Sequence, residues 1–239
     1  MTTVFAERLE AVQQRITEAC HRVDRNPAEV TLVGISKTHP AEALKAAFDA
    51  GLRIFGESRV QEAEAKLEVL PTEMIHAAEW HFIGPLQSNK TRPAVRSFDT
   101  VHAIDRPKIA RRLAHEAKAQ GKVLRGFLEV NLGGEESKHG FSPDALLQLD
   151  ELAGLEALEI IGLMAIPPAP TGSTPRERAE SSRPWFQRLR SLRDQLLQRP
   201  AWASCPGCLS MGMSGDFEVA VEEGATHVRV GSTLFGPRG

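Results

Sequence analysis

Apolar residues recur along the chain in short continuous runs that are separated by amphipathic stretches. The runs span Thr31–Ser36, Arg53–Phe55, Trp80–Ile83, Thr100–Ile104, Leu124–Asn131, Leu158–Ile166, Cys208–Met211 and Thr226–Val230. Runs that are continuous rather than alternating are typical of strands in a parallel sheet that is covered on both faces. Helical stretches between them begin near Pro40, Ser58, Ser88, Arg106, Ser142, Trp185 and Ser214. This alternation predicts an α/β fold with parallel strands and right-handed crossovers.

Eight strands in 239 residues fit a closed (β/α)₈ TIM barrel, which typically takes about 250 residues. An open doubly wound sheet is the alternative. A further segment, Phe5–Val23, precedes the first strand. Its apolar residues stand three or four positions apart and predict an extra amphipathic helix; they are Phe5, Leu9, Val12, Ile16, Cys20 and Val23. We therefore expect one domain over residues 1–239, a barrel with an additional N-terminal helix.

The segment 167–184 interrupts this rhythm, since it is rich in Pro, Ser and Thr and is long for a loop. It follows the sixth predicted strand, so it should lie over the C-terminal face of the barrel. A mobile flap and a plain flexible insertion are both open. The strand–helix pattern resumes afterwards, which argues against a domain boundary here.

Composition limits the classes of partner and the cellular compartment that we expect for this protein. A formal net charge of −2 argues against general electrostatic binding to nucleic acid or to an anionic membrane. No apolar run approaches the roughly 20 residues of a membrane-spanning helix. The three cysteines, Cys20, Cys205 and Cys208, provide no disulfide framework, and the N-terminus turns charged too early for a secretory signal, so we expect a cytoplasmic protein. The Cys205–Cys208 spacing suits a metal or redox pair, but Cys208 leads into a strand and a four-cysteine zinc site is impossible.

Functional groups of such a barrel gather at the C-terminal ends of the strands. Lys37 directly follows the first apolar run. Low-dielectric surroundings lower the pKa of a lysine and free its amine for imine chemistry. A lysine that merely extends from a strand end into solvent is the alternative.

Two small-residue turns follow the seventh and eighth strands. Ser210 and Ser214 lie in Leu209-Ser-Met-Gly-Met-Ser-Gly-Asp, and Arg229 precedes the second turn in Val228-Arg-Val-Gly-Ser-Thr. These loops form the common phosphate site of the fold; a simple helix cap is the alternative for the first. A buried arginine needs a partner, either a heteroaromatic ring nitrogen or a buried carboxylate. An imine lysine, an anion cradle and this arginine together describe a phosphorylated aldehyde.

At this point the chain resembles a known family, the pyridoxal-phosphate homeostasis proteins, which are small single-domain relatives of the alanine racemase barrel. The matching segments are Val33-Gly-Ile-Ser-Lys37-Thr, Phe55-Gly-Glu-Ser-Arg-Val-Gln-Glu62, Trp80-His-Phe-Ile-Gly-Pro-Leu-Gln-Ser-Asn-Lys90, Val130-Asn131 with Ser137-Lys138-His-Gly140, Gly162-Leu-Met-Ala-Ile-Pro167, Leu209-Ser-Met-Gly-Met-Ser-Gly-Asp-Phe217 and Val228-Arg-Val-Gly-Ser-Thr-Leu-Phe-Gly236. They cover nearly the whole chain in order.

The resemblance implies that the protein binds pyridoxal 5′-phosphate (PLP), and it assigns the contacts. It implies an imine on Lys37, Arg229 against the pyridine nitrogen, and phosphate contacts from Ser210, Ser214 and the backbone around Met213, Gly231 and Ser232. It implies a role in intracellular vitamin B6 and amino-acid homeostasis, with PLP-dependent apoenzymes as candidate recipients. Two positions depart from the family pattern. Ser58 replaces an Asn, which shortens a contact to the cofactor or leaves it to water, and Ser232 replaces a Thr but keeps the hydroxyl.

Efficient catalysis is not expected. An arginine at the ring nitrogen disfavours the protonated pyridinium, so the ring is a poorer electron sink. Barrel racemases add a tyrosine from the partner subunit's second domain, but this chain contains no tyrosine and leaves no room for that domain. For the same reason we expect a monomer rather than an obligate dimer. The alternatives are a weakly active PLP-dependent racemase, lyase or deaminase, and an imine-forming sugar-phosphate aldolase without PLP.

Overall fold

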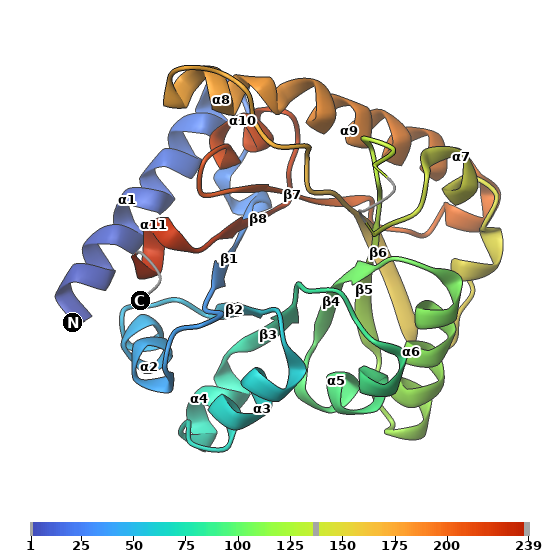
Figure 1. Cartoon of the computed structure of the whole chain (residues 1–239), viewed down its shortest axis with the longest axis horizontal. Coiled ribbons are helices and arrows are strands. Elements are labelled where there is room, and N and C mark those ends of the chain that lie inside the picture. The colour runs from blue at the N-terminus through green and yellow to red at the C-terminus, as the bar shows by residue number, and fades with distance from the viewer. Residues whose placement is uncertain (1, 136–138, 237–239) are drawn as a thin grey trace.

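Eight parallel strands close into a barrel in the computed structural model, which describes residues 2–135 and 139–236 (Figure 1). The strands are β1 (Thr31–Ile35), β2 (Ile54–Glu57), β3 (Glu79–Phe82), β4 (Thr100–Ile104), β5 (Leu124–Glu129), β6 (Leu158–Met164), β7 (Cys208–Met213) and β8 (His227–Val230). Parallel pairing of β1 with β8, in the register Thr31 opposite His227, closes the sheet. This pairing confirms the predicted barrel and excludes the open sheet.

Helices surround the barrel between successive strands (Figure 1). They are α1 (Thr2–His21), α2 (Ala41–Asp49), α3 (Val60–Leu67), α4 (Thr72–Ala77), α5 (Thr91–Ser97), α6 (Pro107–Ala119), α7 (Pro143–Leu146), α8 (Pro175–Ser181), α9 (Arg183–Leu197), α10 (Phe217–Glu222) and α11 (Ser232–Phe235). Short 3₁₀ turns are η1 (Pro27–Glu29), η2 (Ser88–Lys90), η3 (Asp150–Leu152) and η4 (Pro200–Trp202). Ser137 and Lys138, which belong to one matching segment, lie outside the described residues.

The N-terminal helix α1 confirms the predicted extra element. It packs along α10 and α11, where the Phe5 and Phe235 ring centroids are 5.1 Å apart and Arg15 forms a 2.8 Å ion pair with Glu218. The predicted apolar stripe is buried as far as Cys20. Val23, however, follows the end of the helix and is exposed, so its inclusion in the stripe was wrong.

The segment 167–184 is not an uninterrupted loop, contrary to the prediction. Helix α8 begins within it, because Thr174 and Glu177 form a reciprocal capping box around Pro175. Ser182, which follows this helix, is buried and donates a 2.8 Å hydrogen bond to Asp216 at the start of α10. The segment is therefore fixed to the turn that follows β7.

The barrel interior is partly polar. His81, His102, Ser210 and Arg229 are all buried there. Phe127, together with Ala103, Ile161 and Met164, forms a small separate apolar cluster. Within residues 2–135 and 139–236, no helix has the length and hydrophobicity needed to span a membrane. The same residues contain no group of three or more His, Cys, Asp or Glu side chains arranged to hold a metal ion.

Candidate functional site at the mouth of the barrel

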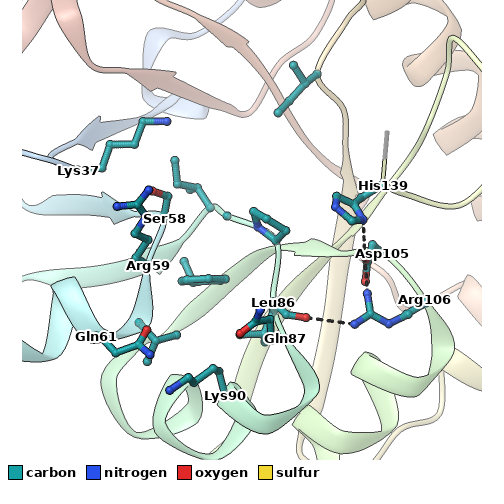
Figure 2. Close-up of a pocket in the computed structure, with 16 residues that line it drawn as sticks. Lys37, Ser58, Arg59, Gln61, Leu86, Gln87, Lys90, Asp105, Arg106 and His139 are labelled. Carbon is teal, nitrogen blue, oxygen red and sulfur yellow. Dashed lines mark hydrogen bonds and ion pairs between the residues drawn. The ribbon is translucent and has the colours of Figure 1, made fainter. Parts of the chain in front are cut away.

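Lys37 stands at the C-terminal end of β1, as predicted. Lys37 lines two hollows of the mouth. Ser58 and Arg59 share the first with it (Figure 2). Gly231 and Ser232 share the second. The next residue, Thr38, has a φ of +68°, in the left-handed region that non-glycine residues rarely adopt. The chain therefore turns sharply just after the lysine.

A buried ion-pair network supports this turn. Lys66 Nζ lies 2.6 Å from Glu57 Oε1 and 2.8 Å from Glu62 Oε1, and it donates to the backbone oxygen of Ser36 over 3.0 Å. Glu62 in turn accepts the backbone N–H of Thr38 over 2.5 Å. Burial raises the pKa of Glu57, and the hydrogen bond and charge of Lys66 oppose that rise. Sequence reasoning missed Lys66, although its position four residues after Glu62 on a helix was a usable signal.

The two small-residue turns meet. The backbone N–H of Gly231, after β8, donates a 3.2 Å hydrogen bond to Ser214 Oγ, after β7. Gly231 and Ser232 also share a cavity with Lys37. The backbone N–H of Met213 donates over 2.7 Å to Asp216 Oδ1, so this amide has a protein partner. The structure thus brings Lys37 and the predicted anion-binding turns to one side of the mouth.

Arg229 points into the barrel interior and is 4% exposed. It donates to Ser210 Oγ over 2.6 Å and to the backbone oxygen of Ala165 over 3.2 Å. No described carboxylate forms an ion pair with it; Asp216 and Glu129 act only as more distant charges, and burial lowers its pKa to about 10. The guanidinium is therefore still protonated at neutral pH and lacks the buried carboxylate that was the alternative partner.

Ser210 lies deeper than the phosphate role predicted for it would suggest. Its side chain is fully buried, and its hydroxyl lies 2.7 Å from His102 Nδ1 as well as 2.6 Å from Arg229 Nη1. These contacts favour a role in holding Arg229. A phosphate contact from Ser210 stays a prediction.

The larger hollow at the mouth has a volume of about 780 Å³ and a cationic lining (Figure 2). Lys37, Arg59, Lys90 and Arg106 line it, and Asp105, the acidic residue of the lining, pairs with Arg106 over 2.5 Å. Arg59 and Lys90 form no ion pair with any described residue. Ser58 also lines this hollow, on the side of Lys37. The site therefore attracts anions.

Comparison with known proteins shows which family model and which curated proteins the chain is similar to. Residues 8–239 match the family model for the alanine racemase N-terminal domain. The pyridoxal phosphate homeostasis protein of Pseudomonas aeruginosa is 46% identical over 242 residues, with 100% of this chain and 97% of that protein covered. The Aquifex aeolicus protein of the same name is 43% identical over 233 residues, covering 97% of each.

Solved structures agree. PipY of Synechococcus elongatus with PLP bound has a TM-score of 0.80 and 39% identity, and the match covers 97% of this chain and 100% of that one. Alanine racemase of Clostridium difficile matches with a TM-score of 0.66 over 56% of its length; at 15% identity this match speaks for the fold alone. A closed barrel with the matching residues at its mouth, and relatives this similar over their whole length, show that the chain belongs to the pyridoxal phosphate homeostasis protein family.

Proposed function

We propose that this chain is a single PLP-binding barrel domain over residues 1–239 that holds the coenzyme as an imine on Lys37 and acts in intracellular PLP and amino-acid homeostasis. One observation carries the proposal: Lys37 and the Gly231–Ser232 turn line one cavity. A reactive amine and an anion-binding turn are thereby placed within reach of a single small molecule.

The donor set fits each part of PLP. Ser214, Gly231 and Ser232 offer hydroxyl and backbone donors for the phosphate, at the loops that hold phosphate in this fold. We assign the backbone at Met213 to the same cradle. Arg229 is a buried cation that pairs with no carboxylate in the described part of the chain, and it suits the lone pair of the pyridine nitrogen. Because arginine can only donate, it favours an unprotonated ring nitrogen.

When bound, PLP supplies an aldehyde that condenses with a primary amine and releases water. Lys37 supplies that amine from a sharply turned strand end, whose position Lys66 fixes through Ser36 and Glu62. Cationic Arg59 and Lys90 beside it attract the anionic coenzyme into the mouth. The residues of this chain thus bind, orient and attract the coenzyme.

A carrier or regulator with little or no turnover is the role we favour. The chain contains no tyrosine to act as the second base of a racemase. The hollow of about 780 Å³ beside Lys37 leaves room for exchange. We further propose that the protein is cytoplasmic, that it is a monomer rather than an obligate dimer, and that PLP-dependent apoenzymes receive its coenzyme. Turnover of amino acids at ordinary enzyme rates, on the order of 1–10³ per second, would contradict this role.

Borohydride reduction tests the attachment. Protein mixed with PLP should show visible absorption that bleaches on reduction, and mass spectrometry of a digest should find a pyridoxyl group on the peptide containing Lys37. Lys37→Ala should lose both signals. Lys37→Arg, which keeps the charge without a reactive amine, is the matched control and should lose the covalent adduct while retaining weak binding. An adduct elsewhere in wild-type protein would contradict the assignment.

A further inference from the structure

A chain of hydrogen-bonded side chains crosses the barrel interior from Arg229. Arg229 Nη1 donates to Ser210 Oγ over 2.6 Å, and Ser210 Oγ lies 2.7 Å from His102 Nδ1. His102 Nε2 lies 2.8 Å from His81 Nδ1. His81 Nε2 then contacts Glu79 Oε1. We call these five residues the polar chain; β8, β7, β4 and β3 contribute them in that order.

The polar chain joins opposite ends of the barrel. Arg229 near the mouth, Ser210, His102 and His81 are all at most 4% exposed. Glu79 is the first residue of β3, at the end of the barrel away from the mouth, and its side chain is 30% exposed. There it accepts a 2.6 Å ion-pair hydrogen bond from Arg125. A charge at the far end is therefore connected to the arginine at the candidate coenzyme site.

Both ends of the polar chain impose the same direction on its protons. Arg229 can only donate, and an ionised Glu79 can only accept, whereas a hydroxyl and a neutral imidazole can do each. With both imidazoles neutral, one arrangement satisfies all four contacts: Ser210 donates to His102 Nδ1, and each imidazole donates from Nε2 to the next acceptor. In this arrangement both histidines carry their proton on Nε2.

The charge states support this arrangement. Burial lowers the pKa of His102 well below its ordinary value, and the charge of Arg229 acts in the same direction, so His102 is neutral at pH 7. Burial raises the pKa of Glu79, but the hydrogen bonds from His81 and Arg125 and the charge of Arg125 lower it, and that pKa is about 2. Glu79 is therefore ionised and serves as an acceptor.

We infer that Glu79 is a positioning residue for Arg229, acting across the barrel through His81, His102 and Ser210. If His102 carried its proton on Nδ1, Ser210 Oγ would face donors on both sides, and the hydroxyl hydrogen would have no acceptor among the polar chain. Arg229 would then share the Ser210 oxygen with a second donor, and its hydrogen bond would be weaker because the hydroxyl would no longer donate onward within the polar chain. Glu79 prevents this by holding both imidazoles in the Nε2–H form. Only the consequence for PLP rests on the proposed function.

Nitrogen-15 NMR of the histidine rings, recorded without PLP, tests the proton arrangement directly. In wild-type protein, His81 and His102 should each show a single neutral Nε2–H form. Glu79→Leu removes the terminal acceptor, so both rings should populate a mixture of the two neutral forms. In the same variant the dissociation constant for PLP should rise about tenfold, as expected when a hydrogen bond to a charged group is weakened.

Arg125→Gln is the matched control. It removes the surface partner of Glu79 but leaves the carboxylate in place, so both readouts should stay as in the wild type. Unchanged histidine forms in Glu79→Leu would overturn the inference, and so would changed forms with unchanged PLP affinity. If Glu79→Leu does not fold, Glu79→Gln replaces it. The amide of the new glutamine can donate to His81 as well as accept from it, so both neutral forms of the histidine rings are again expected. A signal from the Nε2–H form alone would contradict the inference.

A failure of the proposed function would give a different experimental result from a failure of this inference. Wild-type protein that does not bind PLP would contradict the proposed function, whereas the NMR experiment on protein without PLP would still decide whether Glu79 sets the proton arrangement.

Discussion

The backbone N–H of Gly231 donates a hydrogen bond to Ser214 Oγ over 3.2 Å. This contact joins the turn after β7 to the turn after β8. The sequence predicted an anion site at these two turns, because both contain small residues and follow strand ends. The hydroxyl of Ser214 remains able to donate, because it acts as the acceptor in this contact. Ser214 therefore supplies a donor at the point where the two turns meet, next to Gly231, which lines the cavity that contains Lys37.

Ser214→Ala should weaken PLP binding about tenfold, because the phosphate loses a hydrogen bond and Gly231 loses its acceptor. Pyridoxal, which lacks the phosphate, should bind the variant and the wild type equally. Titration of both ligands, followed by absorption, measures this. Ser214→Thr keeps the hydroxyl and is the control. Equal losses for PLP and pyridoxal would show that Ser214 does not contact the phosphate.

Charge at the mouth gives a second prediction, concerning rates. Replacing both Arg59 and Lys90 with Gln should slow PLP association several-fold at low salt and reduce its salt dependence, because the lining of the mouth becomes less cationic. Stopped-flow absorption measures the association and dissociation rates. Lys118→Gln, a surface lysine paired with Glu156 outside this hollow, should change neither. A faster dissociation with unchanged association would mean that Arg59 or Lys90 contacts bound PLP directly.

The fold was readable from the sequence, because strands buried on both faces are continuous apolar runs. Short polar helices could not be predicted in this way. Helix α8 lies in a segment dense in proline, and its start is encoded in Thr174 and Glu177, a capping box that the surrounding Pro, Ser and Thr residues obscured. Helix α4 begins after Pro71 and has a single buried residue, Met74, so it has little apolar periodicity. In α8, local capping rather than hydrophobic pattern marks where the helix starts.

Only part of the candidate site could be predicted from the sequence. The rule that strand ends carry function located Lys37 and the two turns, because it depends on strand order alone. The contact of Ser210 with His102 joins residues 108 positions apart and depends on how β4 and β7 face each other inside the barrel. No pattern within either strand encodes that contact. For the same reason the sequence indicated a buried Arg229 but not its partner.

The network beneath Lys37 gives a third prediction. Lys66→Met should lower the free energy of unfolding by about 3–5 kcal/mol, because it leaves the buried carboxylate of Glu57 without its cation. Denaturant unfolding measures this. Adding Glu57→Gln to Lys66→Met should recover part of the loss, since the unpaired charge is then gone. If the double variant is no more stable than Lys66→Met alone, the loss comes from packing rather than from the buried charge.

Acid sensitivity gives the last prediction. Burial lowers the pKa of His227 to about 3, and the charges of Arg125 and Arg229 act in the same direction, whereas an unfolded chain protonates histidine near pH 6.5. Between these values the unfolded state binds more protons, so stability is present above about pH 6.5 and is lost as the pH falls. The effect is at most about 1.4 kcal/mol per pH unit for one histidine. The surrounding charges, Glu79, Arg125 and Arg229, do not reverse this direction.

His227→Gln should therefore reduce the difference in unfolding free energy between pH 7 and pH 5 by about 2 kcal/mol. Urea unfolding at the two pH values measures that difference, and His115→Gln, the same change at an exposed position on α6, is the control. Because His102 is also buried with a lowered pKa, some acid sensitivity should remain in His227→Gln. A wild-type stability that does not change between pH 7 and pH 5 would contradict the lowered pKa of His227 as a source of acid sensitivity. Protonation of His102 itself would in addition break the directional polar chain from Arg229 to Glu79, since a doubly protonated His102 cannot accept from Ser210.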